Sequence, residues 1–409
     1  MVQVKQTIFG DGVFKNCSTI TSVDCNYGIV ANGSMANIFY NCKNLTTVKN
    51  IPQTITNMYH TFYDCVNLVN VPNIPNCVTD VNHTFYNCQN LVNAPVIPNS
   101  VTDMSGTFSH CQKLVNAPVI PNSVINVDST FSSCSNLVNA PVIPNNVTNM
   151  YYTFGWCSNL VNTPVIPNSV TELVGTFAGC SNLVNAPVIP NSVTNMYYTF
   201  ASCYNLVNAP TIPNSVTDMD STFYYCNKLT NAPVIPNSVT NMHDTFSGCS
   251  NLKTPPTIPN GVTSLYNTFK GCSDLTTAPT IPNGVTNMTS TFASCSNLVN
   301  APSIPNSVTG MYSTFGYCYN MTTAPRIPTS VLNIANAFVD CSNLNNNIYI
   351  EATNIVNATN CFSNTSLTKN VYIPFTYENG VNTLTYNSFI EAGYDTNGTK
   401  DGVYLKELN

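Results

Sequence analysis

The sequence predicts a repeat solenoid of β-dominant coils with short helical or 3₁₀ turns, about 14 regular coils with a cap at each end. Three observations support this prediction. Phenylalanine recurs in 14 copies at a constant step of 23 residues, from Phe39 to Phe338. A cysteine follows each of these phenylalanines by three residues, from Cys42 to Cys341. No insertion interrupts this register, although the surface loops of a globular domain tolerate changes in length.

Each 23-residue unit carries six apolar positions that we expect to form the core. Besides the phenylalanine and the cysteine, these are the isoleucine of an Ile-Pro pair, a valine, a methionine or aliphatic residue, and a leucine. One unit has no second face against which to bury them, so equivalent positions must stack on one another. For the coil of Phe200 the expected core consists of Ile189, Val193, Met196, Phe200, Cys203 and Leu206.

Within a unit, the residue pattern suggests four local structures. We expect one short extended segment at the Val-Ile before the proline and another at Val-Thr-x-Met. The Pro-Asn-Ser between them is typical of a turn, because proline fixes φ and Asn or Ser satisfies local backbone groups. The Thr-Phe-x-x-Cys run is too short for a full helix, so we expect a single helical or 3₁₀ turn there.

The full pattern, Leu-x₆-Pro-x₂-Val-Thr-x-Met-x₂-Thr-Phe-x₂-Cys-x-Asn-Leu, resembles the BspA-like leucine-rich repeats, which are common on bacterial surfaces and in phage-encoded proteins. The resemblance extends from Ile38 to about Leu344 and implies a leucine-rich-repeat type of solenoid. This unit has one more residue between Leu and Ile-Pro and one fewer between Met and Phe, and Thr replaces the family's Ala before Phe in twelve copies. These departures leave the shape of each corner open. The resemblance implies adhesion or binding rather than catalysis.

The repeat divides the chain into three parts. Residues 1–34 contain one degenerate echo of the unit, Phe14 and Cys17, and are expected to form an N-terminal cap. Residues 35–344 form the solenoid. Residues 345–409 are expected to be a C-terminal cap or a small attachment module, with Asn-Gly hairpin signals at 379–380 and 397–398 and a short helix from Thr385 to Gly393.

The cysteine column predicts a ladder of buried thiols rather than disulfides. Stacked equivalent residues have parallel Cβ vectors about 4.8 Å apart, whereas a disulfide needs converging Cβ atoms about 3.8 Å apart. Four cysteines lie outside the column, at positions 17, 25, 77 and 361, and a bridge between Cys17 and Cys25 remains open.

Composition excludes several functions. With only 7% charged residues and a net charge of −6, the chain has no basic stripe for nucleic acid. No apolar run is long enough for membrane insertion. The first eight residues hold no signal-peptide core, so we expect either another route of export or a segment upstream.

His60 and His83, with Asp64 nearby, are too few residues for us to expect a metal site. No catalytic constellation recurs, so we expect neither an enzyme nor a cofactor.

The columns that vary are the two residues after Met and the two after Phe, which we expect to face solvent. Tyr and Trp in these columns, and at Tyr204, give a large contact area at low entropic cost. The candidate ligand-binding residues are Tyr151, Tyr152, Trp156, Tyr197, Tyr198, Tyr204, Tyr224 and Tyr225.

Two functions fit these residues. The first is an extracellular, cell-surface or virion-displayed protein that binds a host glycan or protein. The alternative is a structural spacer or filament-forming subunit that binds other copies of itself through its ends or flanks. Binding predicts aromatic residues gathered on one face, whereas a spacer predicts that they are scattered.

Overall fold

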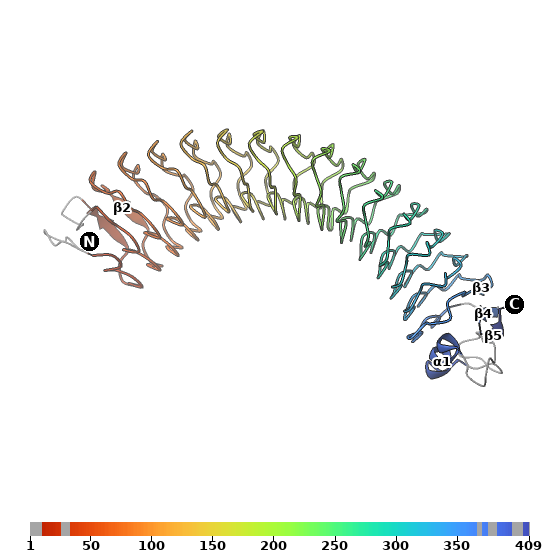
Figure 1. Cartoon of the computed structure of the whole chain (residues 1–409). Coiled ribbons are helices and arrows are strands. Elements are labelled where there is room, and N and C mark those ends of the chain that lie inside the picture. Colours follow the sequence, from red (N-terminus) through yellow and green to blue (C-terminus); the bar gives the residue numbers. More distant parts are fainter. Residues whose placement is uncertain (1–9, 26–32, 366–369, 375–382, 395–403, 409) are drawn as a thin grey trace. The chain divides into compact units, whose positions relative to one another are not determined.

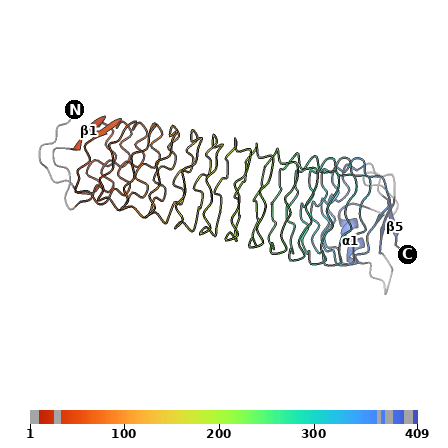
Figure 2. The same ribbon diagram turned by 90° about the horizontal axis from the view of Figure 1, so that it is seen from above.

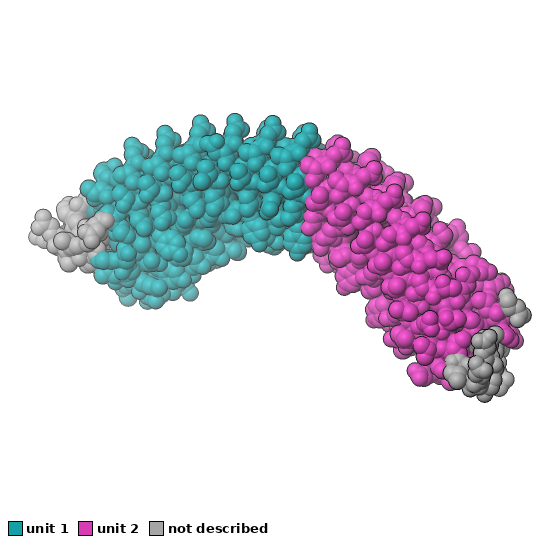
Figure 3. All heavy atoms as spheres, viewed as in Figure 1, with its two compact units in different colours: residues 1–206 teal, residues 207–409 magenta. Residues whose placement is uncertain are grey.

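The computed structural model describes residues 10–25, 33–365, 370–374, 383–394 and 404–408 (Figure 1). The chain forms two compact units, Met1–Leu206 and Val207–Asn409 (Figure 3). Each unit is a stack of 23-residue coils, and successive coils lie side by side in both ribbon views (Figures 1 and 2). The predicted solenoid is therefore confirmed within each unit.

Stacked phenylalanine rings form the centre of both units. In the first unit the rings of Phe131 and Phe154 are nearly parallel, with centroids 5.7 Å apart. In the second unit Phe269 and Phe292 stack at 5.6 Å. The six residues predicted as the core of the Phe200 coil are all buried, with Ile189 the most exposed at 5%. The apolar positions of the repeat thus form one continuous core through each stack.

Neighbouring coils pair through isolated parallel bridges at two columns. One column is the residue before Met in Val-Thr-x-Met, as in the bridge between Asp80 and Asp103, which confirms the extended segment predicted there. The other is the Asn of Leu-Val-Asn, as in the bridge between Asn93 and Asn116. The segment predicted to be extended at Val-Ile forms no bridge to the neighbouring coil in most coils, and among the described residues it pairs at Ile327 and Ile350. Prolines flank this dipeptide on both sides, and proline has no N–H to donate to a neighbouring coil.

The Pro-Asn-Ser segment is a turn, as predicted. The amide of Val101 donates to the carbonyl of Pro98 at 3.1 Å and closes four residues into a β-turn. The serine of the next turn, Ser123, donates its hydroxyl to the carbonyl of Val101 at 2.6 Å. Turn residues therefore also hold successive coils together.

The run around Thr-Phe is a series of β-turns and not the single helical turn that we predicted. Met150 to Thr153 and Phe154 to Cys157 are each closed by a bond between the amide of the last residue and the carbonyl of the first. The third residue of both turns has positive φ, 48° at Tyr152 and 59° at Trp156, as a type II turn requires. A left-handed residue on each side of Phe prevents continuous helical winding.

This left-handed geometry recurs in every described coil. Two residues before Phe, the positive-φ positions are Asn37, His60, His83, Gly106, Ser129, Tyr152, Gly175, Tyr198, Ser221, Asp244, Asn267, Ser290, Ser313, Asn336 and Asn360. Two residues after Phe, they are Asn41, Asp64, Asn87, His110, Ser133, Trp156, Gly179, Ser202, Tyr225, Gly248, Gly271, Ser294, Tyr317, Asp340 and Asn364. Neither column contains a β-branched residue, because such residues fit poorly at positive φ. The columns that vary in sequence are therefore restricted in backbone geometry.

The cysteine column and the threonine column, which holds Thr in twelve of the 14 copies, hydrogen-bond to the preceding coil. The Cys157 thiol donates to the carbonyl of Phe131 with a sulfur–oxygen distance of 3.0 Å. The Thr153 hydroxyl donates to the carbonyl of Val127 at 3.2 Å. All eighteen cysteines are free in this structure, and those of the repeat column are buried, as the thiol ladder predicts; Cys17 and Cys25 are not bridged. The thiols are donors as well as small apolar side chains.

At the N-terminal end, the degenerate repeat continues the core. The ring of Phe14 stacks on Phe39 with centroids 5.7 Å apart. Strand β1 (Ser22–Asp24) pairs in parallel with β2 (Thr47–Lys49). Residues 10–25 therefore present the first layer of backbone and aromatic partners to the regular coils.

At the C-terminal end, three strands form a parallel sheet in the order β3 (Ile348–Tyr349), β4 (Asn370–Ile373), β5 (Tyr404–Glu407). Helix α1 (Leu384–Glu391) lies between β4 and β5 in sequence, and its Phe389 stacks on Phe362 at 6.2 Å. The predicted short helix is confirmed, and Gly393 with φ of 90° follows it. The two Asn-Gly signals lie outside the described residues.

Candidate functional site

Six of the predicted aromatic residues gather on the first unit, in two coils separated by one other coil. We call them the aromatic patch: Tyr151, Tyr152, Trp156, Tyr197, Tyr198 and Tyr204. Tyr152 stacks on Trp156 with ring centroids 5.2 Å apart and an interplanar angle of 3°. Tyr151 meets the Tyr152 ring edge-on at 4.7 Å. Trp156 is 48% exposed, so the stacked pair keeps a large aromatic area open to solvent.

The turns around Phe154 fix the backbone of this aromatic pair. Tyr152 and Trp156 are the left-handed residues of the two type II turns, and both amides donate to the next coil. Tyr152 donates to Val174 at 2.9 Å, and Trp156 donates to Ala178. The cost of the left-handed conformation, about 1–2 kcal/mol per residue, is offset by these bonds. The two rings are consequently held at fixed points beside each other.

Glycines in the next coil make room for both rings. A Cβ atom added at Gly175 would lie 2.3 Å from Cε1 of Tyr152, and one at Gly179 would lie 2.6 Å from Cδ1 of Trp156. Each glycine is 23 residues after the aromatic residue that covers it. The same pairing recurs elsewhere, with His83 over Gly106 and Tyr225 over Gly248. Our sequence interpretation missed this signal, which is visible as an aromatic residue or histidine followed by glycine one repeat later.

The phenol groups of the patch interact across the intervening coil. The pKa of Tyr152 is raised, first by burial and then by the nearby phenols of Tyr151, Tyr197 and Tyr198. The pKa of Tyr198 is likewise raised by burial and by Tyr197 and Tyr204. Residues 46 positions apart in sequence therefore share one neutral surface of aromatic faces and hydroxyl groups.

The second unit carries its own aromatic pair. Tyr224 and Tyr225 meet edge-on with centroids 4.6 Å apart, and Tyr225 is 44% exposed. The expectation that all four variable columns face solvent was wrong for the residue directly after Phe. In three successive coils this residue, Gly155, Ala178 or Ala201, is buried. In other coils the same position carries larger residues that are less buried, such as Tyr63, Tyr86 and Tyr224.

The histidine pair lies in the third and fourth described coils of the first unit. The rings of His60 and His83 meet edge-on with centroids 5.2 Å apart. Burial lowers the pKa of both imidazoles, and His83 lowers that of His60 further. Across the described ranges, no three or more His, Cys, Asp or Glu side chains are grouped to hold a metal ion.

A single substitution tests how the glycine supports the indole. We expect Gly179→Ala to displace Trp156, the only tryptophan of the chain, and to increase the quenching of its fluorescence by acrylamide. The added Cβ would overlap the ring, and φ of 72° adds roughly 1–2 kcal/mol of backbone cost.

Gly271→Ala is the matched control for this experiment. Gly271 occupies the same column with φ of 74°, but its nearest neighbour is the Cα atom of Gly248 at 3.5 Å. This variant should be destabilised without a change in tryptophan quenching. Unchanged quenching in Gly179→Ala would contradict the proposed contact.

Stacked 23-residue coils with a Phe, Cys and Leu core define a leucine-rich repeat protein. A family model described as "BspA type Leucine rich repeat region (6 copies)" matches residues 2–115, 59–173, 150–276 and 266–392. The chain therefore belongs to the BspA-type leucine-rich repeat family, as its pattern suggested. No curated protein matches the chain.

Two crystal structures resemble the chain. One is of a leucine-rich repeat protein from Bacteroides ovatus ATCC 8483, with 20% identity and a TM-score of 0.56, covering 98% of this chain and 87% of that chain. The other is of a leucine rich cell surface protein from Faecalibacterium prausnitzii A2-165, with 22% identity and a TM-score of 0.46, covering 85% and 90%. The first likeness supports the fold. Among the described residues, no helix has the length and apolar character to cross a membrane.

Proposed function

We propose that this protein is a non-enzymatic adhesion protein of a cell or virion surface, and that the aromatic patch binds its ligand. Proteins of the BspA-type family are generally bacterial surface proteins, which supports this location. The observation that carries the proposal is the gathering of six aromatic side chains in two coils, two of which, Tyr152 and Trp156, lie over glycines of the coil between them. A spacer has no need for such a cluster.

The chemistry of the patch favours a neutral glycan over a charged ligand. Indole and phenol faces provide flat apolar area with little conformational entropy to lose. The phenol hydroxyls of Tyr151, Tyr152, Tyr197 and Tyr198 add hydrogen-bonding groups, and none of the six side chains is charged at neutral pH. A protein segment rich in hydroxyl and apolar groups is the second ligand class that fits this chemistry.

We expect that replacing Tyr151, Tyr152 and Trp156 together by alanine abolishes binding on an array of host glycans. Loss of the stacked pair removes the largest exposed aromatic area of the patch. Titration of the unmodified chain with a glycan from the array should change the fluorescence of Trp156, because no other tryptophan contributes to the signal.

Tyr59→Ala is the control, because Tyr59 is an exposed residue of the same column as Tyr151 in an earlier coil. It should leave binding unchanged. A triple variant that binds the array as the parent does would remove the patch from the proposed function. Binding to host protein extracts but to no glycan would assign the patch to the protein class.

A further inference from the structure

A row of exposed valines runs along the first unit. Each valine lies in the Pro-Val-Ile-Pro segment, and five consecutive coils contribute one: Val96, Val119, Val142, Val165 and Val188. The last four are 85–88% exposed, and Val96 is 66% exposed. The isoleucine that follows each valine is at most 5% exposed. The extended backbone therefore turns one apolar side chain inward and the next outward.

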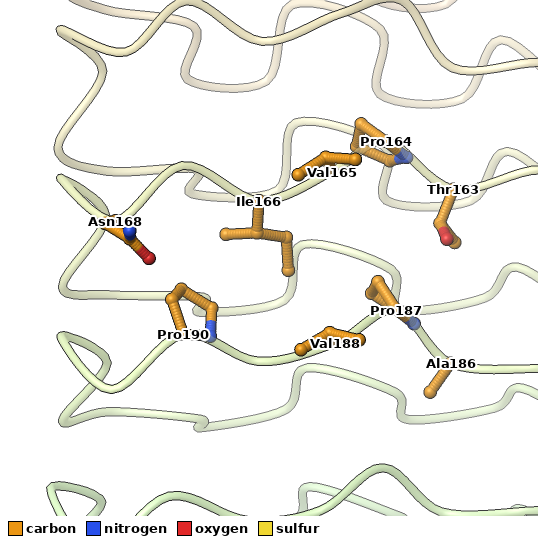
Figure 4. Close-up of a pocket in the computed structure, with 9 residues that line it drawn as sticks. All are labelled: Thr163, Pro164, Val165, Ile166, Asn168, Ala186, Pro187, Val188 and Pro190. Carbon is orange, nitrogen blue, oxygen red and sulfur yellow. The ribbon is translucent and has the colours of Figure 1, made fainter.

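A hollow lies between two valines of successive coils, and because the coils repeat, we expect the same hollow between the other valines of the row. The hollow between Val165 and Val188 has a volume of about 510 Å³ and is lined by Pro164, Ile166 and Pro187 among others (Figure 4). All nine of its lining residues are uncharged. We call the five valines and the hollows between them the valine ridge. It is a corrugated apolar surface whose period is that of the repeat.

We propose that the valine ridge is an interface at which a second copy of this chain binds. A second copy carries the same corrugation with the same period, so the valines of one copy fit the hollows of the other. An uncharged surface selects an uncharged partner, and an interface that joins the same patch on both subunits is the commonest form of dimer.

The exposed area is sufficient for a weak but specific dimer. With roughly 150 Å² for a fully exposed valine, the five side chains present about 600 Å² per copy, compared with about 800 Å² per partner in a standard stable interface. Apolar patches larger than a few hundred Å² are uncommon on monomers and mark interaction sites. The flanking proline and threonine edges of each hollow add to this area.

The interface is independent of the proposed adhesion function. The valine ridge shares no residue with the aromatic patch, so a variant in one leaves the other in place. Self-association would bring two aromatic patches into one assembly, and linked sites bind a multivalent ligand more tightly than a single site does.

Other coils of this chain carry hydroxyl-bearing residues at the valine position, and these residues indicate which substitutions to test. At the position of the exposed valine, coils of the second unit carry Thr257, Thr280 and Ser303, all of them exposed. A hydroxyl-bearing side chain of similar shape is thus compatible with the coil. At a protein concentration low enough for both chains to be monomeric, we expect Val119→Thr, Val142→Thr and Val165→Thr combined to keep the far-ultraviolet circular dichroism and the unfolding midpoint of the parent.

Sedimentation equilibrium of the full chain measures the association. We expect the parent to form dimers, and the triple variant to raise the dimer dissociation constant by at least about tenfold. A parent that stays monomeric up to about 100 µM would overturn the proposal, and so would a triple variant that associates as tightly as the parent. A monomeric parent that binds phosphatidylcholine vesicles would assign the ridge to a lipid surface instead.

Cross-linking locates the contact. Val142 is the middle valine of the five, so it enters a hollow beside its own counterpart whether the two copies run parallel or antiparallel. Val142→Cys should give a dimer with a short bismaleimide, whereas Thr280→Cys, at the same position of the second unit, should give none beyond the parent. Equal cross-linking of the two variants would contradict an interface at the ridge.

Discussion

Stability should fall steeply as the pH rises from about 9 to about 11, because the buried thiols resist ionisation only while the protein is folded. Burial raises the pKa of Cys42 to about 11 and that of Cys157 and Cys341 to about 12. The ordinary thiol value is 9.0. The contribution of each thiol is therefore complete below pH 9 and is lost as the pH rises toward the folded-state pKa.

The loss of stability at high pH should be large because the cysteine column contains many buried thiols. A single thiol of this kind costs about 1.4 kcal/mol of stability for each pH unit above its unfolded-state pKa. Many equivalent thiols within one stack add their contributions, so the slope should correspond to the release of several protons on unfolding. The measurement is guanidinium unfolding at a series of pH values in the presence of a reductant.

Replacing one thiol separates its contribution from that of tyrosine. Burial also raises the pKa of Tyr63, to about 12, and this residue acts in the same direction. Cys157→Ala removes one buried thiol and leaves every tyrosine, so its stability should fall with pH by about 1.4 kcal/mol less per unit than that of the parent. Identical slopes, or a parent whose stability does not change between pH 8 and 11, would show that the thiols are not protected by folding.

Phe154→Ala should destabilise the first unit by about 3–5 kcal/mol, the cost of removing a large buried aromatic side chain and leaving a cavity. The Phe154 side chain is fully buried. It stacks between Phe131 at 5.7 Å and Phe177 at 5.9 Å, so its loss affects two neighbouring coils. Each coil has only its two neighbours to pack against, which limits the relaxation that could refill the space.

Guanidinium unfolding, followed by circular dichroism and by Trp156 fluorescence, measures this loss. Trp156 lies in the same coil and reports locally. The midpoints are compared because repeat arrays can unfold in more than one step. Val165→Thr, measured at a concentration where the chain is monomeric, is the control, since a surface substitution away from the core should change stability by no more than about 0.5 kcal/mol. A loss below about 1 kcal/mol in Phe154→Ala would contradict the role of the stack.

The repeat period was enough to predict the core. Phe, Cys and Leu recur in a fixed register, and a unit of 23 residues can bury them only against equivalent residues of the next unit. The degenerate repeat at Phe14 was predicted on the same grounds. The short helix that contains Phe389 was predicted instead from the glycine that ends it. The helical turn around Phe was predicted wrongly, because residue types alone do not show that an amide such as that of Tyr152 bonds to the next coil.

The candidate site was predicted in part. The sequence indicated the aromatic residues but not their support by Gly175 and Gly179, since that relation joins positions one coil apart. The core prediction included the isoleucine position of Ile166 and not that of Val165, but it did not indicate that Val165 would be almost fully exposed. The structure exposes Val165 and buries Ile166.

The sequence by itself thus determined the class of fold, the register of the core and the stacking of the cysteines in one buried column, because all three follow from a fixed period. Only the tertiary structure decided which side of the backbone each apolar residue takes, which residues adopt positive φ, and which aromatic rings meet. These features depend on the geometry of hydrogen bonds and contacts between coils, which residue types alone do not specify. The aromatic patch and the valine ridge both depend on this geometry between coils.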